Sequence, residues 1–492
     1  MNYIGVSCGF HDAGLSLIGN NGELLFAGHS ERYSKHKHDS DLCTSIVKDA
    51  FHYLTDDYSI HYYEKPWLKA LRQLRAGQKL GPFSPKKIIG AAVMEEFGNR
   101  SVKTHGHHLC HAAAGFQTSP YNDATVVVID AIGELDCITI WDARYDDNGI
   151  AKYKKLYSKK YPNSLGLMYS SLTAYVGLRP MDEEYILMGM AAYGEPIHYN
   201  KFKEDFLEDE TTLDFKRNLH IRLEDDYLIG ADHMNIAASA QMFIEQLIRT
   251  IMIKSRVLGC SNNLVYGGGV ALNCLANRML GNFYDNIWIM PNPGDAGNSL
   301  GAAALGYGKK IQWVDAFLGH NIKGDYPVEA VIQELETNKM VGVANGRAEF
   351  GPRALGNRSL LADPRGPEIK DKVNEIKRRQ KFRPFAPVIL EEHVDQYFIM
   401  PHGWTDSRYM QVIATCRHPD LYPAIVHHDG TSRVQTVPKD RSGIRQLLEA
   451  WYAKTGCPML LNTSLNIRGE PMVNDRFDAD RFQTLYNLKV IS

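Results

Sequence analysis

The 492-residue sequence lacks the features of three special protein classes. No apolar run approaches the ~20 residues that span a bilayer, so we expect no membrane-embedded segment. Residues 1–14 lack a basic start followed by an apolar stretch and contain His11 and Asp12, so we expect no secretory signal and a cytoplasmic location. The eight cysteines form no C-x-x-C pair, which argues against a disulfide framework or zinc knuckle and predicts free thiols.

The chain also lacks a strong net charge. Its formal charge is -2 and its sequence pI is near 6.8, so no overall field would draw it to nucleic acid. Apolar residues make up 44% and charged residues 23%, as in ordinary soluble proteins. The length exceeds what one hydrophobic core serves and predicts two domains.

A strand followed by a hairpin occurs twice. Residues 3–7 read as a strand, and residues 15–18 and 23–27 as two more, joined through Asn20-Asn21-Gly22. Residues 125–129, 137–143 and 150–157 repeat this order, with Asp130 after the first strand. The duplication predicts two related α/β halves facing each other across a cleft, as in the actin and sugar-kinase architecture.

The first domain continues with a helix and a further strand before a second α/β unit begins. Residues 236–258 predict a helix and residues 263–266 a strand, whereas periodicity is lost over residues 309–326. Strands and helices alternate again from Met340 to the end. We therefore predict an α/β protein with domains at residues 1–325 and 326–492.

His107 and His111 lie four residues apart in a helix-like segment, which places both imidazoles on one face. Such a pair can share a metal ion, although packed helix histidines are an equally open reading. Asp130 at a strand end and Asp295 in a glycine-rich turn could complete the shell, or Asp295 could cap a helix. His108 reads as a packing histidine.

Two segments predict anion binding. Gly267-Gly268-Gly269, followed by Asn273, links a strand to a helix, so backbone amides could approach phosphates or simply form a turn. In the second domain, Arg353 lies among glycines, and Lys381 and Arg383 lie beside apolar residues. Because arginine binds phosphate bidentately, an anion pocket is favoured there. Ser464 and Asn466 offer small polar donors in a turn, which says little alone.

Together these segments resemble the NodU/CmcH/tobramycin family of carbamoyltransferases along essentially the whole chain. The resemblance rests on the following blocks: Gly9-Phe10-His11-Asp12-Ala13, Ser30-Glu31-Arg32-Tyr33-Ser34 with Lys35 to His38, His107-His108-Leu109-Cys110-His111-Ala112-Ala113, Glu184-Tyr185 through Tyr193-Gly194, Gly268-Gly269-Val270-Ala271-Leu272-Asn273, Gly351-Pro352-Arg353-Ala354-Leu355-Gly356 and Asn462-Thr463-Ser464-Leu465-Asn466.

The resemblance implies an actin-like N-terminal domain that is similar to the tRNA threonylcarbamoyl-transfer enzyme. It implies a metal, iron or another divalent ion, between the following residues: His107, His111, Asp130 and Asp295. The C-terminal domain resembles YrdC, in which K-x-R and S-x-N motifs bind anionic substrates, matched here by Lys381-Phe382-Arg383 and Ser464-Leu465-Asn466. Carbamoyl phosphate and ATP, with its Mg²⁺, would there form carbamoyl-adenylate for transfer to a hydroxyl.

Three residues are expected to act on the reacting groups. His11 could accept the proton of the attacking hydroxyl, with Asp12 beside it, or be a turn histidine that bonds the backbone. Arg353 could neutralise polyphosphate. The chain departs from the family at Ile186, where a lysine is usual, and at Ala131, where a glycine is usual, which leaves nucleotide and acceptor contacts open.

The acceptor stays open between a natural-product sugar and a hydroxymethylated nucleobase in a nucleotide or in modified phage DNA. Two rival functions are a threonylcarbamoyl transferase acting on tRNA, which the near-neutral charge disfavours, and a regulatory ATP-binding module without transfer.

Overall fold

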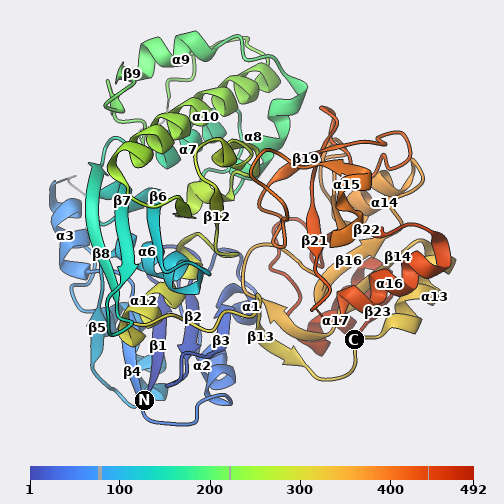
Figure 1. Ribbon diagram of the computed structural model, residues 1–492, viewed down its shortest axis with the longest axis horizontal. Helices are drawn as coiled ribbons and strands as arrows, with labels where there is room; N and C mark the ends of the chain where they lie inside the picture. Colours follow the sequence, from blue (N-terminus) through green and yellow to red (C-terminus); the bar gives the residue numbers. More distant parts are fainter. Residues whose placement is uncertain (76–79, 221–222, 442) are drawn as a thin grey trace.

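The computed structural model describes residues 1–75, 80–220, 223–441 and 443–492, and its N-terminal part contains two sheets of the same layout (Figure 1). The first has the order β3-β2-β1-β4-β5 and the second the order β8-β7-β6-β11-β12. The strands of the first are β1 (Asn2–Ser7), β2 (Gly14–Ile18), β3 (Leu24–His29), β4 (Tyr58–Tyr62) and β5 (Val102–Thr104). Those of the second are β6 (Asp123–Gly133), β7 (Asp136–Tyr145), β8 (Ala151–Lys160), β11 (Asn263–Gly267) and β12 (Asn286–Trp288).

Both sheets begin with three antiparallel strands and continue with two strands parallel to the first. The predicted duplication and the actin-like α/β class are therefore confirmed. The predicted strand ends differ from those of the structure by at most four residues. The largest difference is β6, which continues to Gly133 and does not stop before Asp130.

Two helices pack between the sheets. Helix α6 (His107–Thr118) packs on β6 and β11, and α12 (Asn298–Tyr307) packs on β1 and β2. They cross so closely that a Cβ at Gly301 would lie 1.9 Å from the carbonyl oxygen of Cys110. Glycine is therefore required at this crossing, which brings the starts of both helices together.

The outer layers are helical. Helices α2 (Thr44–Phe51), α4 (Pro85–Ile89) and α5 (Ala91–Glu96) cover the first sheet. Helices α7 (Leu165–Tyr175), α8 (Glu184–Met190), α9 (Tyr199–Phe206) and α10 (His233–Leu258) form the core of the second half. By length and composition α10 passes as a membrane span, which the sequence reading did not anticipate, but 67% of its apolar window is buried in this core.

The C-terminal part, orange to red in Figure 1, is built on a mixed sheet of order β21-β17-β22-β16-β14-β23. Its strands are β14 (Met340–Ala344), β16 (Arg358–Ala362), β17 (Ala386–Leu390), β21 (Gln435–Val437), β22 (Met459–Ser464) and β23 (Val490–Ile491). Helices α13 (Val328–Asn338) and α16 (Ile444–Thr455) cover one face, and α14 (Ile369–Ile376) and α17 (Arg476–Tyr486) the other. This is the second α/β unit expected from the sequence.

A ribbon of β13 (Phe317–Ile322) and β15 (Gly346–Glu349) lies where the two parts meet. The domain boundary predicted at residue 325 falls between β13 and α13. It stays a prediction, since β13, which precedes it, pairs with β15, which follows it. Contacts such as Arg32 Nη2 to the Gly351 carbonyl, 2.8 Å, hold the two parts together.

Candidate metal and anion site

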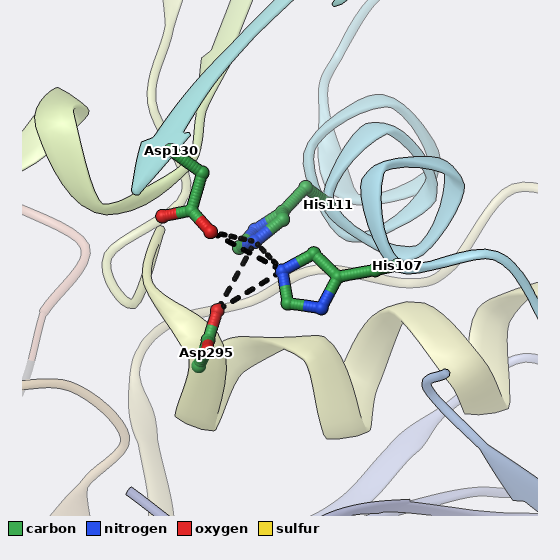
Figure 2. A group of neighbouring side chains, drawn as sticks. All are labelled: His107, His111, Asp130 and Asp295. Carbon is green, nitrogen blue, oxygen red and sulfur yellow. Dashed lines mark hydrogen bonds and ion pairs between the residues drawn. The ribbon is translucent and has the colours of Figure 1, made fainter. Parts of the chain in front are cut away.

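Four side chains from three places in the chain meet in one buried cluster (Figure 2). His107 Nε2 lies 3.2 Å from both Asp130 Oδ2 and Asp295 Oδ1, and 3.1 Å from His111 Nε2. His111 Nε2 is 3.4 Å from Asp295 Oδ1. The structure thus brings together all four predicted ligands, with ligand atoms within 4.8 Å of one another.

Backbone geometry explains why Asp130 is available although its strand continues. The parallel ladder between β6 and β11 ends at Val128, and the ladder with β7 becomes irregular after Ile129. Asp130 therefore leaves the regular pairing. Its Oδ1 accepts the amide of Gly269 at 3.0 Å, which leaves Oδ2 for the histidines.

The donor set fits a divalent cation. Asp295 Oδ1 is buried and forms no hydrogen bond with any described residue. Although burial opposes it, Asp295 and Asp130 raise the pKa of His107 well above its usual range, so the cluster favours positive charge. Imidazole nitrogens and carboxylate oxygens are ligands of iron, zinc and related metals, and the geometry does not select one. His108 is turned toward Thr139 Oγ1, 2.9 Å away, and is not part of the cluster.

His11 lies at the edge of this cluster. Its Nε2 is 3.6 Å from Asp295 Oδ2, and its Nδ1 is 2.9 Å from Asp12 Oδ2. Asp12 Oδ1 contacts His38 Nδ1 at 2.7 Å, and His38 Nε2 contacts Asp182 at 2.8 Å. Burial lowers the pKa of His11, but the bond to Asp12 and the charge of Asp295 outweigh it and raise the pKa to about 8.

A cavity of about 520 Å³ connects this region to the C-terminal part. His11, Asp130 and Asp295 line one end, and Ser464 and Asn466 line the other. Both predicted centres therefore open into the same space, although they lie in different parts of the chain.

The C-terminal end of the cavity is rich in cations. They are Arg353, Lys377, Arg379, Arg383, Arg433 and Arg468. Of these, Arg468 forms an ion pair, with Glu183, and none of the other five forms one with a described residue. Burial and repulsion from Arg433 lower the pKa of Arg353. The Cζ atom of Arg383 lies 4.8 Å from the centroid of the Tyr185 ring. This excess of positive charge is suited to binding anions.

The structure separates the two cations of the predicted K-x-R motif, because Arg383 lines the cavity and Lys381 does not. Lys381 is 69% exposed, faces Glu375 at 3.9 Å and does not line the cavity. Lys377 lies at the cavity instead, where its Nζ is 3.1 Å from Ser464 Oγ and 3.0 Å from Asn466 Oδ1. Burial, then the charges of Arg379 and Arg383, lowers the pKa of Lys377 well below its usual range. Lys377-Arg378-Arg379 also reads K-x-R, and both Lys377 and Arg379 line the cavity.

The glycine segment contributes less surface than predicted. Gly269 and Asn273 line the cavity, but Gly267 and Gly268 do not. Asn273 also caps a helix, since its Oδ1 accepts the Ala276 amide at 3.1 Å. Ile186, where the family usually has lysine, is 1% exposed and packs in the core, whereas Ala131 lines the cavity.

Comparison with known proteins supplies a family context. Residues 54–304 match the family model for the carbamoyltransferase N-terminus and residues 332–491 the model for the carbamoyltransferase C-terminus. The uncharacterized protein sll1178 of Synechocystis is 30% identical over 97% of this chain and 93% of its own length. Nodulation protein NolNO of Sinorhizobium fredii is 28% identical over 95% of this chain and 76% of its own length. A solved activator of the 2-hydroxyisocaproyl-CoA dehydratase from Clostridium difficile is 13% identical over 62% of this chain and 94% of that one, with a TM-score of 0.34.

Proposed function

This chain belongs to the carbamoyltransferase family, and we propose that it is an ATP-dependent O-carbamoyltransferase that uses carbamoyl phosphate. The carrying observation is the single cavity that joins the cationic end around Lys377 to the histidine and aspartate cluster. Activation of the carbamoyl group and its transfer need both ends of the cavity. Activation requires a site that binds anions, and transfer requires a base and a Lewis-acidic cation.

The activation step is assigned to the cationic end. Water converts carbamoyl phosphate to carbamate and phosphate, a carbamate oxygen attacks the α-phosphorus of ATP, and pyrophosphate leaves, which gives carbamoyl-adenylate. Arg353, Lys377 and Arg383 would offset the repulsion between the two anionic substrates. ATP enters with Mg²⁺.

The transfer step is assigned to the other end of the cavity. The acceptor hydroxyl oxygen attacks the carbamoyl carbon, its proton passes to His11 Nε2, and AMP leaves. Asp12 fixes the His11 ring by accepting from Nδ1, which directs Nε2 toward the cluster. A divalent cation held by His107, His111, Asp130 and Asp295, which we propose to be iron, would supply Lewis acidity toward the leaving phosphate.

We propose a hydroxyl of a natural-product sugar or of a hydroxymethylated nucleobase, free or in DNA, as the acceptor. The cytoplasm is the proposed location, supported by the eight cysteines, which all lie in the described residues and are free, as predicted.

The test separates the two steps. Purified protein is incubated with ATP and labelled carbamoyl phosphate, and pyrophosphate release is measured before any acceptor is added. We expect release that depends on carbamoyl phosphate. Release that requires threonine and bicarbonate instead would identify a threonylcarbamoyl transferase, and no release with either would leave a nucleotide-binding module. Panels of aminoglycosides, hydroxymethylated nucleotides and hydroxymethylated DNA then reveal the acceptor by its gain in mass.

A further inference from the structure

Glu64 faces the metal cluster from behind. It follows β4 by two residues and is 4% exposed. Its Oε1 lies 3.5 Å from Nδ1 of His107, the ring nitrogen that points away from the cluster. Nδ1 is buried and forms no hydrogen bond with a described residue, so the Glu64 carboxylate is the charged group placed to receive its proton.

The ring of His107 is confined on its other sides. The Tyr63 ring lies 5.2 Å from it, centroid to centroid. A Cβ at Gly133 would lie 2.2 Å from His107 Cδ2, so the backbone of β6 presses against the ring. With Nε2 directed at Asp130 and Asp295, Nδ1 can turn only toward Glu64, and a small rotation closes the 3.5 Å gap to a hydrogen bond.

We infer that Glu64 is a positioning residue that orients His107 as a ligand, with Lys69 as its counter-ion. A histidine that binds a cation through Nε2 carries its proton on Nδ1, and a carboxylate there fixes the tautomer and strengthens the ligand. This inference rests on the cation site of the proposed function, but not on which substrate is used.

Lys69 balances the charge and links the cluster to the loop that carries His11. Its Nζ lies 3.0 Å from Glu64 Oε2 and 3.5 Å from the Gly9 carbonyl, and 5.4 Å from the centroid of the Phe10 ring. Without Lys69, Glu64 would add a third buried negative charge to those of Asp130 and Asp295. Lys69 therefore allows the third carboxylate to be buried.

The experiment measures cation affinity directly. Wild-type protein and the variants Glu64→Gln, Glu64→Ala and Lys69→Met are stripped with a chelator and titrated with Co²⁺, with the visible absorption spectrum as readout. We expect Glu64→Gln, which keeps the shape but not the charge, to bind about 10-fold more weakly, and Glu64→Ala to bind up to about 100-fold more weakly with an altered spectrum. Lys69→Met leaves the Glu64 carboxylate without its counter-ion, so we expect binding weaker than that of wild type but stronger than that of Glu64→Ala.

The matched control is Glu134→Gln. Glu134 directly follows β6, and its carboxylate accepts a hydrogen bond from the Lys65 amide at 2.6 Å. Its Co²⁺ affinity should equal that of wild type. Folded Glu64→Gln protein with wild-type affinity and spectrum would overturn the inference. If instead every protein, wild type included, binds no Co²⁺, the cation site of the proposed function fails first. Pyrophosphate release, measured in parallel, tests the activation chemistry independently of either result.

Discussion

His107 and His111 hold their Nε2 atoms 3.1 Å apart, one turn from each other on α6, and both face the same two carboxylates. Two ring nitrogens so close can either hydrogen-bond to each other or bind a common cation, and the two carboxylates beside them favour the cation. The pair therefore defines where the ion binds, and each of the two aspartates can be tested against it.

Replacing Asp295 with asparagine should abolish tight cation binding. The change removes one of two negative charges beside His107 Nε2, which lies 3.2 Å from Asp295 Oδ1, and replaces one carboxylate oxygen with an amide nitrogen that cannot bind a cation. We expect the affinity to fall by more than the about 10- to 100-fold that the loss of an outer partner costs. Metal content after dialysis, measured by elemental analysis, checks this. Asp136→Asn is the control, because Asp136 lies on β7 and accepts a hydrogen bond from Lys155 on β8; equal loss in both variants would contradict the assignment.

Helical spacing in the sequence predicted the histidine pair of this cluster, whereas the full set with Asp130 and Asp295 was implied by the family resemblance. His107 and His111 belong to one helix, whose periodicity fixes their common face, and Asp295 directly precedes a second helix. What the sequence did not contain is the close crossing at Gly301, which brings the two helix starts together, or the position of Glu64, whose role depends on packing between distant segments. Helical spacing is local, whereas these contacts are not.

Lys377 and Lys381 should differ sharply in activity. Lys377→Met removes a buried ammonium that contacts Ser464 and Asn466 in the cavity, whereas Lys381→Met removes an exposed one. We expect pyrophosphate release to fall about 100-fold or more in the first variant, the scale of losing a preorganised charge contact, and to stay within about twofold in the second. Thermal unfolding shows whether either variant is misfolded. The reverse order of activities would restore Lys381 as the motif lysine.

Lys381 was predicted because Lys381-Phe382-Arg383 matches the K-x-R motif that the resemblance to the YrdC domain implies. Helix α14 ends at Ile376, so Lys377 lies at the start of a turn that directs it inward against β22. Burial of this kind depends on the end of a helix and on a strand more than eighty residues later, and neither is visible in a local motif.

Stability should fall as the pH rises from about 6.5 to about 9, because of His38. Burial lowers its pKa, but hydrogen bonds to Asp12 and Asp182 outweigh this and raise it from the ordinary 6.5 to about 9. Lys37 opposes the increase. Since the folded state binds the proton more tightly, the stabilisation is complete below pH 6.5 and is lost through pH 9; it amounts to about 2–3 kcal/mol.

Urea unfolding of wild type and His38→Gln at several pH values measures this effect. The two proteins should differ most at pH 6 and converge above pH 9. His36→Gln, which changes an exposed histidine two residues away, should keep the wild-type slope. A constant difference between wild type and His38→Gln at every pH would show that the contribution of His38 does not depend on its charge.

Gly268 should be sensitive to replacement by alanine, whereas Gly267 should not. Gly268 has a φ of 87°, and a Cβ there would lie 2.2 Å from the Ile129 carbonyl oxygen, whereas the nearest atom to a Cβ at Gly267 is 3.6 Å away. Gly268→Ala thus combines backbone strain of about 1–2 kcal/mol with a clash against the residue before Asp130. We expect a melting temperature lower by several degrees and weaker cation binding, because Asp130 must move with Ile129. Gly267→Ala fits its strand and should leave both unchanged. Calorimetry with and without added metal distinguishes the two effects, and normal cation binding by a destabilised Gly268→Ala protein would show that Ile129 can shift without displacing the carboxylate.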